Sequence, residues 1–346
     1  MPHSIRKRTE QWEANQLASH ATLASESRGR ERREPQDSIR TVYQVDRDRI
    51  LHSKAFRRLK HKTQVFIDPF GDHFRTRLTH ALEVMQVGRT IGRALQLNED
   101  LVEAICLGHD MGHTPFGHTG EAVLNTLLRD HFGMGFKHNA QSVRIAEKLE
   151  DDGAGLNLTW EVRDGLFHHP WAEGIPATPE GWTARLSDRL AYINHDLDDA
   201  FRAGVIKPAD LPAAATKVLG TKRSARFDIL VGDAIEFSTG KAHITFSPRV
   251  KAAFLALYKF MFEQVYLSPR ARAEADKAGR VVKSLFHYYL DHPQALPDEI
   301  YGRKKHRAPR GKVLGQLLAD YIAGMTDRFA IDQFHSLYTP RSFGEI

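Results

Sequence analysis

The feature that most constrains this chain is residues 108–121, GHDMGHTPFGHTGE, which gather three histidines and two carboxylates within fourteen residues. Packing gives no reason for this concentration. A divalent metal ion beside a proton-transfer group does, because neutral imidazole and carboxylate are common metal ligands. Neighbouring residues on a helix point about 100° apart, so His109 and Asp110 can reach one ion only where a helix ends. Gly108 and Gly112 predict that ending. The alternative interpretation is a polar loop whose histidines are accidental.

Two predicted helices would place further histidines near this segment. The first begins near Thr79, and its buried stripe follows helical spacing: His80, Val84, Val87, Ile91 and Leu95. The second begins at about Asn98 and carries an apolar stripe that ends at His109. A lone histidine on an apolar face is more often a core residue than a ligand. Antiparallel packing of the two helices would nevertheless bring His80 and His109 together, which favours a ligand role for both.

A third predicted helix, residues 182–202, has acidic residues on a second face. Its apolar stripe consists of Leu186, Leu190, Ile193 and Leu197. Asp188, Tyr192 and Asp196 recur at i, i+4 spacing on the roughly opposite side. Most charged helix stripes are solvated. A tyrosine between two aspartates, on a helix that is already apolar on its other side, instead favours burial of both faces.

Asp188 is then the carboxylate that would complete a metal site. The full set is His80, His109, Asp110 and Asp188. Two imidazoles and two carboxylates suit Mn, Mg, Fe or Zn and leave coordination positions for water and substrate. An ion of this kind lowers the pKa of bound water and neutralises phosphoryl oxygens. His118 and Glu121 lie three residues apart, a spacing that on a helix lets a carboxylate orient an imidazole for proton transfer.

Composition and missing motifs narrow the reaction class. The chain has 49 Lys and Arg against 43 Asp and Glu, and the resulting net charge of +6 fits a polyanionic small substrate or nucleic acid without selecting either. The single cysteine, Cys106, excludes an intramolecular disulfide and predicts a reducing compartment. We expect a cytoplasmic protein with no membrane contact, because the sequence shows neither a secretory signal nor a long uncharged apolar run. P-loop and G-x-S-x-G patterns are missing, so metal-assisted hydrolysis is the leading class.

These residues resemble a known family. The H…HD…D pattern of His80, His109-Asp110 and Asp188 resembles the HD-domain metal-dependent phosphohydrolases. Longer segments resemble one branch of them, the deoxynucleotide triphosphohydrolases of the dGTPase family: RTRLTH (75–80), residues 108–121, FKHNAQS (136–142) and SDRLAYINHDLDDA (187–200). Two segments outside these motifs also resemble the same family: DRDRILHSKAFRRLKHKTQVF (46–66) and ADYIAGMTDRFA (319–330). The resemblance therefore covers nearly the whole chain.

The resemblance implies hydrolysis of a dNTP to the deoxynucleoside and inorganic triphosphate, with a divalent metal ion such as Mg, Mn or another transition metal. The matching metal ligands are His80, His109, Asp110 and Asp188. The matching catalytic residues are His118 and Glu121, together with His113, which also matches a histidine that lines the triphosphate. The matching substrate contacts are Arg77 and His138 at the phosphates, and Gln64, Tyr192 and Asp196 at the deoxyribose. Close packing around that sugar would exclude a 2′-hydroxyl.

The resemblance and the helical stripes together predict an all-α fold, an HD-domain helical bundle with additional helices. We expect a charged N-terminal arm (1–40) that is mobile or bound to a partner, an HD-domain core (41–215) and a helical C-terminal part packed on the core (216–346). Within the last part, the alternation of IEFSTGKAHITF (235–246) predicts one small β-hairpin. For the basic loop GRKKHRAPRGK (302–312), simple solvation is favoured over anion binding.

Small departures from the family pattern leave the chemistry intact but leave base preference open. Met111 stands where the family usually has leucine, and Trp182 and the run His168-His169-Pro170 vary a less regular segment. Relatives differ in whether a second nucleotide activates them, and they commonly form tetramers or hexamers, so we expect a homo-oligomer.

Two alternative functions remain. One is an HD phosphohydrolase of another nucleotide, such as a nucleotidase or phosphodiesterase. The other is a nucleic-acid-binding regulator that uses the basic arm and the 302–312 loop, with steep salt dependence.

Overall fold

The computed structural model describes residues 5–67, 74–298 and 309–340. Over these ranges the chain consists of helices and connecting loops, with two isolated β-bridges, Arg30 to Thr159 and Thr63 to Thr76, and no strand. The prediction of an all-α fold is therefore confirmed. Most of the predicted basic loop at residues 302–312 lies outside the described residues.

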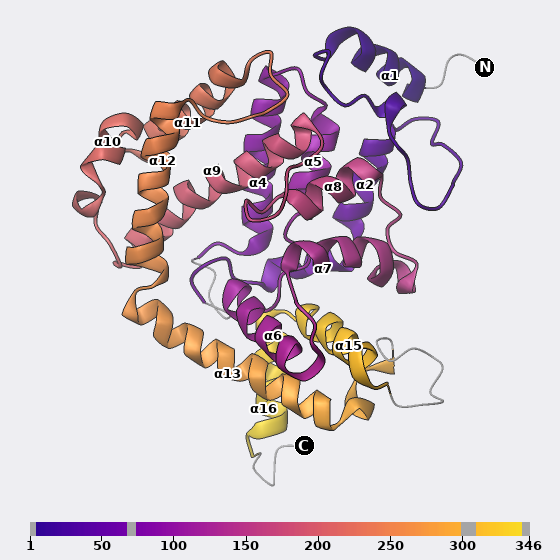
Figure 1. Cartoon of the computed structure of the whole chain (residues 1–346), viewed down its shortest axis with the longest axis vertical. Helices are drawn as coiled ribbons and strands as arrows, with labels where there is room; N and C mark the ends of the chain where they lie inside the picture. The colour runs from indigo at the N-terminus through magenta and orange to yellow at the C-terminus, as the bar shows by residue number, and fades with distance from the viewer. Residues whose placement is uncertain (1–4, 68–73, 299–308, 341–346) are drawn as a thin grey trace.

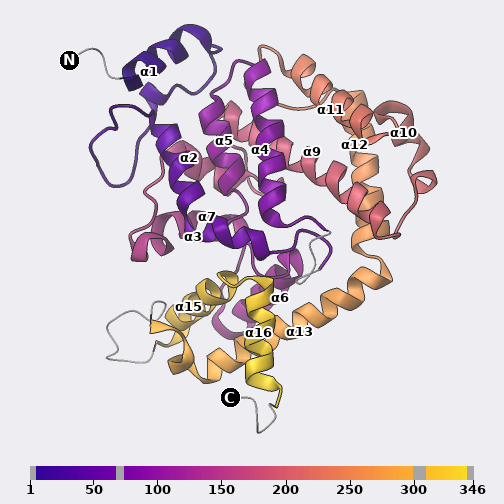
Figure 2. The ribbon, with the colours of Figure 1, turned by 180° about the vertical axis from the view of Figure 1, so that it is seen from behind.

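The helices form three groups, each with its own cluster of buried apolar side chains (Figure 1). A central group contains α2 (Val42–His52), α4 (Arg77–Ala94), α5 (Glu99–Gly108), α8 (Trp160–His168) and α9 (Pro179–Arg202). Beside it lie α10 (Ala213–Leu219), α11 (Arg223–Ser238) and α12 (Pro248–Met261). The third group, farthest from α1 (Ile5–Gln16) in Figures 1 and 2, contains α6 (Gly117–Phe132), α13 (Pro269–Asp291), α15 (Gly311–Ala323) and α16 (Asp327–Tyr338).

Two short helices, α3 (Lys54–Arg58) and α7 (His138–Arg144), lie between the central group and the third group (Figure 2). Single helical turns complete the described chain: Ala24–Glu26, Leu59–His61, Ile145–Leu149, Asp151–Gly153, Pro208–Asp210, Phe262–Tyr266 and Pro293–Ala295.

Helices α4 and α5 bring the first predicted ligands together. α5 begins as predicted, because the side chain of Asn98 accepts the N–H of Leu101 (3.3 Å). α4 begins earlier than predicted: its cap is Thr76, whose hydroxyl accepts the N–H of Thr79 (3.4 Å). Since a short connection turns the chain back between these packed helices, the rings of His80 and His109 lie 5.5 Å apart, centroid to centroid.

The predicted β-hairpin at residues 235–246 is wrong. α11 continues through Ser238, so the first half of the alternating segment is helical. The hydroxyl of Ser238 then donates to the Thr245 carbonyl and accepts the Thr245 N–H, both at 3.0 Å, which replaces the pairing that a second strand would supply. Ile244 and Phe246 are buried in the core shared with α12. A short alternating run is compatible with either structure, and here tertiary burial decides.

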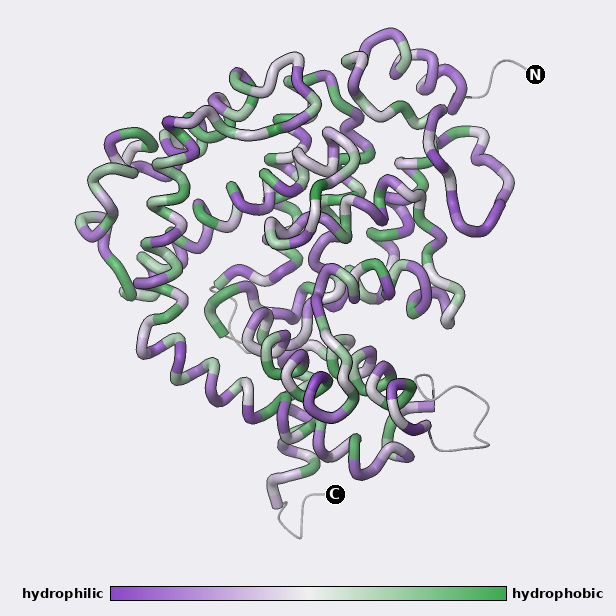
Figure 3. The backbone as a smooth tube through the Cα atoms, in the orientation of Figure 1, coloured by the Kyte–Doolittle hydropathy of each residue, from purple (hydrophilic) through white to green (hydrophobic). Residues whose placement is uncertain are grey.

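The N-terminal segment packs against the central group of its own chain, although we expected a mobile or partner-bound arm. It is largely hydrophilic, as Figure 3 shows. Thr22 donates its N–H (3.0 Å) and hydroxyl (2.7 Å) to the buried carboxylate of Glu180. The guanidinium of Arg30 pairs with the buried carboxylate of Asp46. Carboxylates of the core therefore anchor a polar segment whose composition alone predicts no fixed position.

Near the C-terminus, Leu314, Leu318, Tyr321, Met325 and Phe329 follow helical spacing in the sequence, but the structure divides this segment between two helices. α15 ends at Ala323, and α16 begins at Asp327 with Thr326 as its cap. This break places the buried side chain of Asp327 at the start of α16, where it meets the functional site. Among the residues that the structure describes, no helix combines the length and apolarity needed to cross a bilayer.

Candidate active site

The predicted site residues gather around one cavity of about 600 Å³. Those that line it are Gln64, Arg77, His80, Asp110, His113, His118, His138, Asp188 and Tyr192. His109, Glu121 and Asp196 are set behind this lining and contact its members. The structure therefore brings residues from α4, α6, α7 and α9 to the same place, as the sequence predicted.

The four predicted metal ligands lie together, and we call them the quartet. Nε2 of His80 lies 3.1 Å from Oδ1 of Asp188. Nε2 of His109 lies 3.8 Å from the same oxygen and 3.5 Å from Oδ1 of Asp110. α5 ends at Gly108, directly before the adjacent ligand pair, which lets both side chains of that pair turn inward.

An orphaned nitrogen shows that the quartet fits a metal ion. Nδ1 of His109 lies 2.7 Å from the Cys106 carbonyl oxygen, which can only accept, so Nδ1 carries the proton. Nε2 of His109 is then a lone pair, and it is buried with no hydrogen-bond partner among the described residues. Two carboxylates face that lone pair, and a cation placed between them would give it a partner. The donor set of imidazole and carboxylate suits a divalent ion.

Both carboxylates of the quartet are held in the ionised form that a metal needs. Burial by itself raises the pKa of Asp110, but the Arg77 guanidinium outweighs it and holds that pKa well below its usual range. Nη1 of Arg77 lies 2.7 Å from Oδ2 of Asp110. Burial also raises the pKa of Asp188, and the hydrogen bond from His80 lowers it below the usual range.

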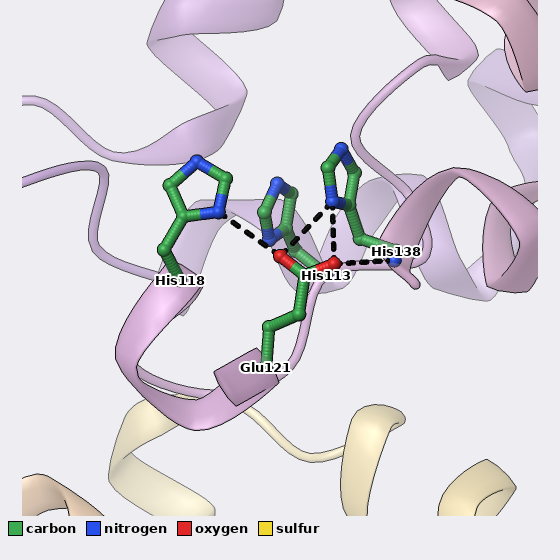
Figure 4. Close-up of side chains that lie close together, drawn as sticks. All are labelled: His113, His118, Glu121 and His138. Carbon is green, nitrogen blue, oxygen red and sulfur yellow. Dashed lines mark hydrogen bonds and ion pairs between the residues drawn. The ribbon is translucent and has the colours of Figure 1, made fainter. Parts of the chain in front are cut away.

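A second group of histidines surrounds Glu121 on α6; we call it the Glu121 group (Figure 4). This carboxylate accepts Nδ1–H of His118 (3.0 Å), Nδ1–H of His138 (2.9 Å) and the backbone N–H of His138 (2.8 Å). Burial alone would raise the pKa of Glu121, but the hydrogen bonds of His118 and His138 outweigh it and hold the pKa well below its usual range. Glu121 thus fixes the tautomers and orientations of both rings.

His118 is the accessible member of the Glu121 group. Its side chain is 65% exposed, whereas that of Glu121 is 16% exposed. With Nδ1–H bound to the carboxylate, Nε2 is the nitrogen that is free to accept a proton. An exposed imidazole oriented by a buried carboxylate is the arrangement of a general base or acid.

His113 connects the quartet and the Glu121 group. Its Nε2 lies 3.3 Å from Oδ1 of Asp110, and its ring stacks on His138 with 3.8 Å between centroids. Burial, with the nearby charge of Arg77, holds the pKa of His113 well below its usual range. The ring therefore stays neutral at physiological pH.

His169 is a site residue that the sequence analysis missed. It follows α8, is buried, lines the cavity and places its ring 5.1 Å from that of His109. Burial lowers its pKa to about 3. We had treated the run His168-His169-Pro170 as irregular variation. One feature of the sequence points to this residue: a pair of adjacent polar residues at the end of a helix, which is also how His109 and Asp110 are placed.

Lys62 and Asp327 hold the loop between Asp110 and His118. The buried ammonium of Lys62 donates to the His113 carbonyl, and also to the last carbonyl of α15 (2.7 Å). Asp327 accepts the N–H of Phe116 (2.9 Å) and the hydroxyl of Thr63 (2.6 Å). The C-terminal helices thereby anchor the loop that separates the quartet from the Glu121 group.

The backbone of this loop includes a conformation and a close approach that few residue types allow. Phe116 has φ +61°, a left-handed conformation that a bulky residue adopts only when its surroundings impose it. At Gly112 an added Cβ would lie 2.1 Å from the His138 carbonyl oxygen, so only glycine permits this approach of α7.

The residues predicted to hold a sugar are placed at different depths. Gln64 and Tyr192 line the cavity, and Oε1 of Gln64 is buried without a partner among the described residues. Asp196 lies behind them and accepts the hydroxyl of Tyr266 (2.9 Å), whose ring is 5.4 Å from that of Tyr192. The sequence analysis did not identify the aromatic wall beside them: Phe66, Phe74, Tyr258, Phe262 and Tyr266.

Comparison with known proteins finds family models and relatives that match most of the chain. Residues 77–193 match the HD domain and residues 244–336 match the phosphohydrolase-associated domain. A deoxyguanosinetriphosphate triphosphohydrolase-like protein of Caldanaerobacter subterraneus subsp. tengcongensis is 50% identical over 99% of this chain and 98% of its own. One from Clostridium tetani is 46% identical over 98% of this chain and 97% of its own. A solved phosphohydrolase from Bacteroides thetaiotaomicron is similar in fold, with a TM-score of 0.51 and 17% identity over 84% of this chain and 69% of its own.

Proposed function

This chain belongs to the family of deoxyguanosinetriphosphate triphosphohydrolase-like proteins, and from that premise we propose that it hydrolyses dNTPs to the deoxynucleoside and inorganic triphosphate. One observation carries the proposal. The quartet and the exposed, carboxylate-oriented His118 open on one cavity, and Gln64 and Tyr192 line that same cavity. Phosphoryl chemistry and nucleoside binding would then occur in one place.

In this proposal His80, His109, Asp110 and Asp188 hold a divalent metal ion. Bound there, such an ion would neutralise phosphoryl oxygens and lower the pKa of a bound water. Asp110 and Asp188 are kept ionised for this role by the surrounding cations and hydrogen bonds. Arg77 orients Asp110 through its 2.7 Å contact and also lines the cavity, so its guanidinium can meet an incoming phosphate.

His118 transfers the proton in the proposed reaction. Glu121 keeps Nδ1 protonated, so Nε2 is the atom that takes a proton from water or returns one to the leaving oxygen. His113 remains neutral and donates from Nε2 toward Asp110. His138, which lines the same wall, is available to the triphosphate side of the substrate.

The nucleoside would bind toward Tyr192 and the aromatic wall. Gln64 offers a buried, unpartnered Oε1 to a sugar hydroxyl. Asp196 positions Tyr266 against Tyr192, which narrows the space available for an additional 2′-hydroxyl. The substrate is accordingly dGTP or several dNTPs, and the cellular role is control of deoxynucleotide pools in the cytoplasm. A homo-oligomer and an activating second nucleotide are part of the same proposal.

A product assay tests the reaction. Each dNTP is incubated alone and in an equimolar mixture with Mg, Mn or Co, and products are separated by anion exchange. We expect inorganic triphosphate and deoxynucleoside. Triphosphate from the mixture alone would reveal activation by a second nucleotide. Pyrophosphate or monophosphate as the product would overturn the proposal in favour of another HD phosphohydrolase. Tight DNA binding without turnover would favour a regulator.

A further inference from the structure

A buried lysine joins two segments that lie far apart in the sequence. Lys62 follows the helical turn Leu59–His61 and is only 2% exposed. Its ammonium donates to the carbonyl oxygen of His113, in the loop before α6, and to that of Ala323, the last residue of α15 (2.7 Å). Because removing an ammonium from water is costly, this position calls for an explanation beyond the filling of a core.

The corner between α15 and α16, residues 323–327, lies beside α3 (Figure 2). The carbonyl oxygen of Gly324 accepts Nη1–H of Arg58 (3.2 Å). The carboxylate of Asp327 accepts the N–H of Thr63 (3.0 Å) and the N–H of Phe116 (2.9 Å). This corner therefore contacts both the segment that carries the buried lysine and the loop that leads into α6.

The position of that loop determines where the proton-transfer group lies relative to the quartet. The loop runs from Asp110, a quartet residue, to His118 in the first turn of α6. Between them, Phe116 has φ +61°, which a bulky residue adopts only when its surroundings impose it. A loop held in this way relaxes when a contact is lost, and a shift of about 1 Å in a reacting group can lower a rate by about 10²-fold.

We propose that Lys62 is a positioning residue for the reaction: its ammonium ties the loop to the end of α15 and thereby sets where His118 lies relative to the quartet. The contacts of Lys62 are with main-chain carbonyls, so it acts through the loop and not on the substrate. This inference rests on the proposed function, because the position of His118 matters only if a proton is transferred there.

Hydrogen–deuterium exchange tests the position of the loop without any turnover. Lys62→Met keeps an unbranched side chain of similar length and removes the ammonium. We expect the backbone amides of residues 112–118 to exchange at least about tenfold faster in this variant, under conditions where the chain is folded. Metal content should match the wild type, because the quartet is untouched. Lys62→Gln, whose shorter side chain cannot span both carbonyls, is the second variant if the methionine variant folds poorly.

Steady-state kinetics then separate positioning from stability. With the dNTP that the wild type hydrolyses, Lys62→Met should lower kcat by about 10- to 100-fold and leave KM nearly unchanged, because the lost contact is not with the substrate. Lys62→Arg, which keeps the charge and the N–H donors, should recover most of that rate. A folded Lys62→Met chain with lower stability but wild-type kcat would mean that the lysine is only structural, and would overturn the proposal.

Arg58→Met is the matched control. Arg58 donates to the same corner between α15 and α16, but its side chain is exposed and its contact is with Gly324 rather than with the loop. This variant should keep the wild-type exchange of residues 112–118 and the wild-type kcat. Equal acceleration of loop exchange in the Arg58 and Lys62 variants would show a general weakening of the corner and would contradict a specific role for Lys62.

The two proposals fail separately. If the wild type releases inorganic triphosphate and Lys62→Met has wild-type kcat and loop exchange, only the positioning role is overturned. If the wild type releases no triphosphate from any dNTP, the proposed reaction is overturned, and loop exchange in the Lys62 variants still decides whether the lysine holds the loop.

Discussion

The quartet and the Glu121 group are built from the same residue types but differ in what satisfies their carboxylates. In the quartet, the buried Nε2 of His109 faces Asp110 and Asp188 without donating to either, and it has no hydrogen-bond partner among the described residues. In the Glu121 group, the carboxylate accepts N–H donors from two rings and one backbone amide. The first arrangement leaves a buried nitrogen that a cation would satisfy, and in the second the carboxylate is already satisfied by hydrogen-bond donors.

This difference teaches that ligand-type residues at short distances do not by themselves indicate a metal. His113, His118, Glu121 and His138 lie close enough to hold an ion. Their hydrogen bonds direct N–H groups at the carboxylate, however, and leave the exposed His118 for proton transfer. His138 is held from both sides, because its Nδ1–H donates to Glu121 and its Nε2 lies 3.1 Å from Nε2 of His169.

The largest effect is expected for Asp110→Ala. Removing this carboxylate of the quartet should abolish metal binding and activity, with helix content by circular dichroism unchanged. The buried Arg77 loses its partner, so stability should fall by about 3–5 kcal/mol, the usual consequence of leaving one charge of a buried pair alone. Asp110→Asn, which keeps a hydrogen-bond acceptor for Arg77, is the control for that loss. Full turnover by either variant would show that the site is misplaced.

His118→Ala should separate the two groups most clearly. The quartet is untouched, so metal content and substrate binding should match the wild type. The rate should fall by roughly 10² to 10⁴, the usual contribution of a positioned acid or base. Single-turnover kinetics and elemental analysis on the same preparation measure both quantities. A loss of metal equal to the loss of rate would erase the distinction between the groups.

Glu121→Gln should have a smaller effect than His118→Ala. The amide oxygen can accept from one ring but cannot hold both His118 and His138 as the carboxylate does. We expect a rate loss of about 10- to 100-fold, the usual consequence of removing a residue that orients a functional histidine. The pH–rate profile should also move, because His118 loses its charged partner. An unchanged profile would mean that Glu121 does not act through His118.

Asp327→Asn should destabilise the loop between the quartet and the Glu121 group without changing the residues of either group. Asp327 accepts from Phe116 and Thr63, and an amide cannot replace every contact of the carboxylate. We expect a loss of about 1–3 kcal/mol in unfolding free energy by urea denaturation. The rate should fall less than in Glu121→Gln, and metal content should stay unchanged. Thr63→Val, which removes one donor, should give a fraction of the same loss.

The pH dependence of stability should distinguish the groups in the metal-free chain. A group whose pKa is lowered by folding binds fewer protons in the native state, so stability falls as the pH drops below its ordinary pKa. For His169 that decline begins near its ordinary 6.5 and continues to about 3. For Glu121 it begins only near its ordinary 4.5. Urea denaturation at a series of pH values measures the unfolding free energy. His169→Gln should reduce its loss between pH 6.5 and 4.5, and Glu121→Gln should reduce only the loss below pH 4.5. The reverse pattern would contradict these assignments.

The quartet could be predicted because local sequence carries its geometry. His80 and His109 lie on the apolar stripes of consecutive helices, and a short connection forces those helices to pack with both histidines at the same end. Asp188 follows helical spacing on α9, and the glycines around the His109-Asp110 pair mark the helix end. The all-α fold was predictable for the same reason, since periodicity is a local property.

The remaining features depend on contacts between distant segments. Nothing local indicates that His169 would face His138, that Asp196 would sit behind Tyr266, or that Asp327 would accept the N–H of Phe116. The alternating run at residues 235–246 predicted strands because its local pattern allows them, and burial against α12 favoured a helix and a loop instead.

By itself, the sequence determined which residue types the site would contain and which helices would carry most of them. Only the tertiary structure decided which atoms of those residues meet. That difference sets their chemistry, because His118 donates to a carboxylate and keeps its other nitrogen exposed for proton transfer, while His109 turns its lone pair toward two carboxylates, where a cation would fit.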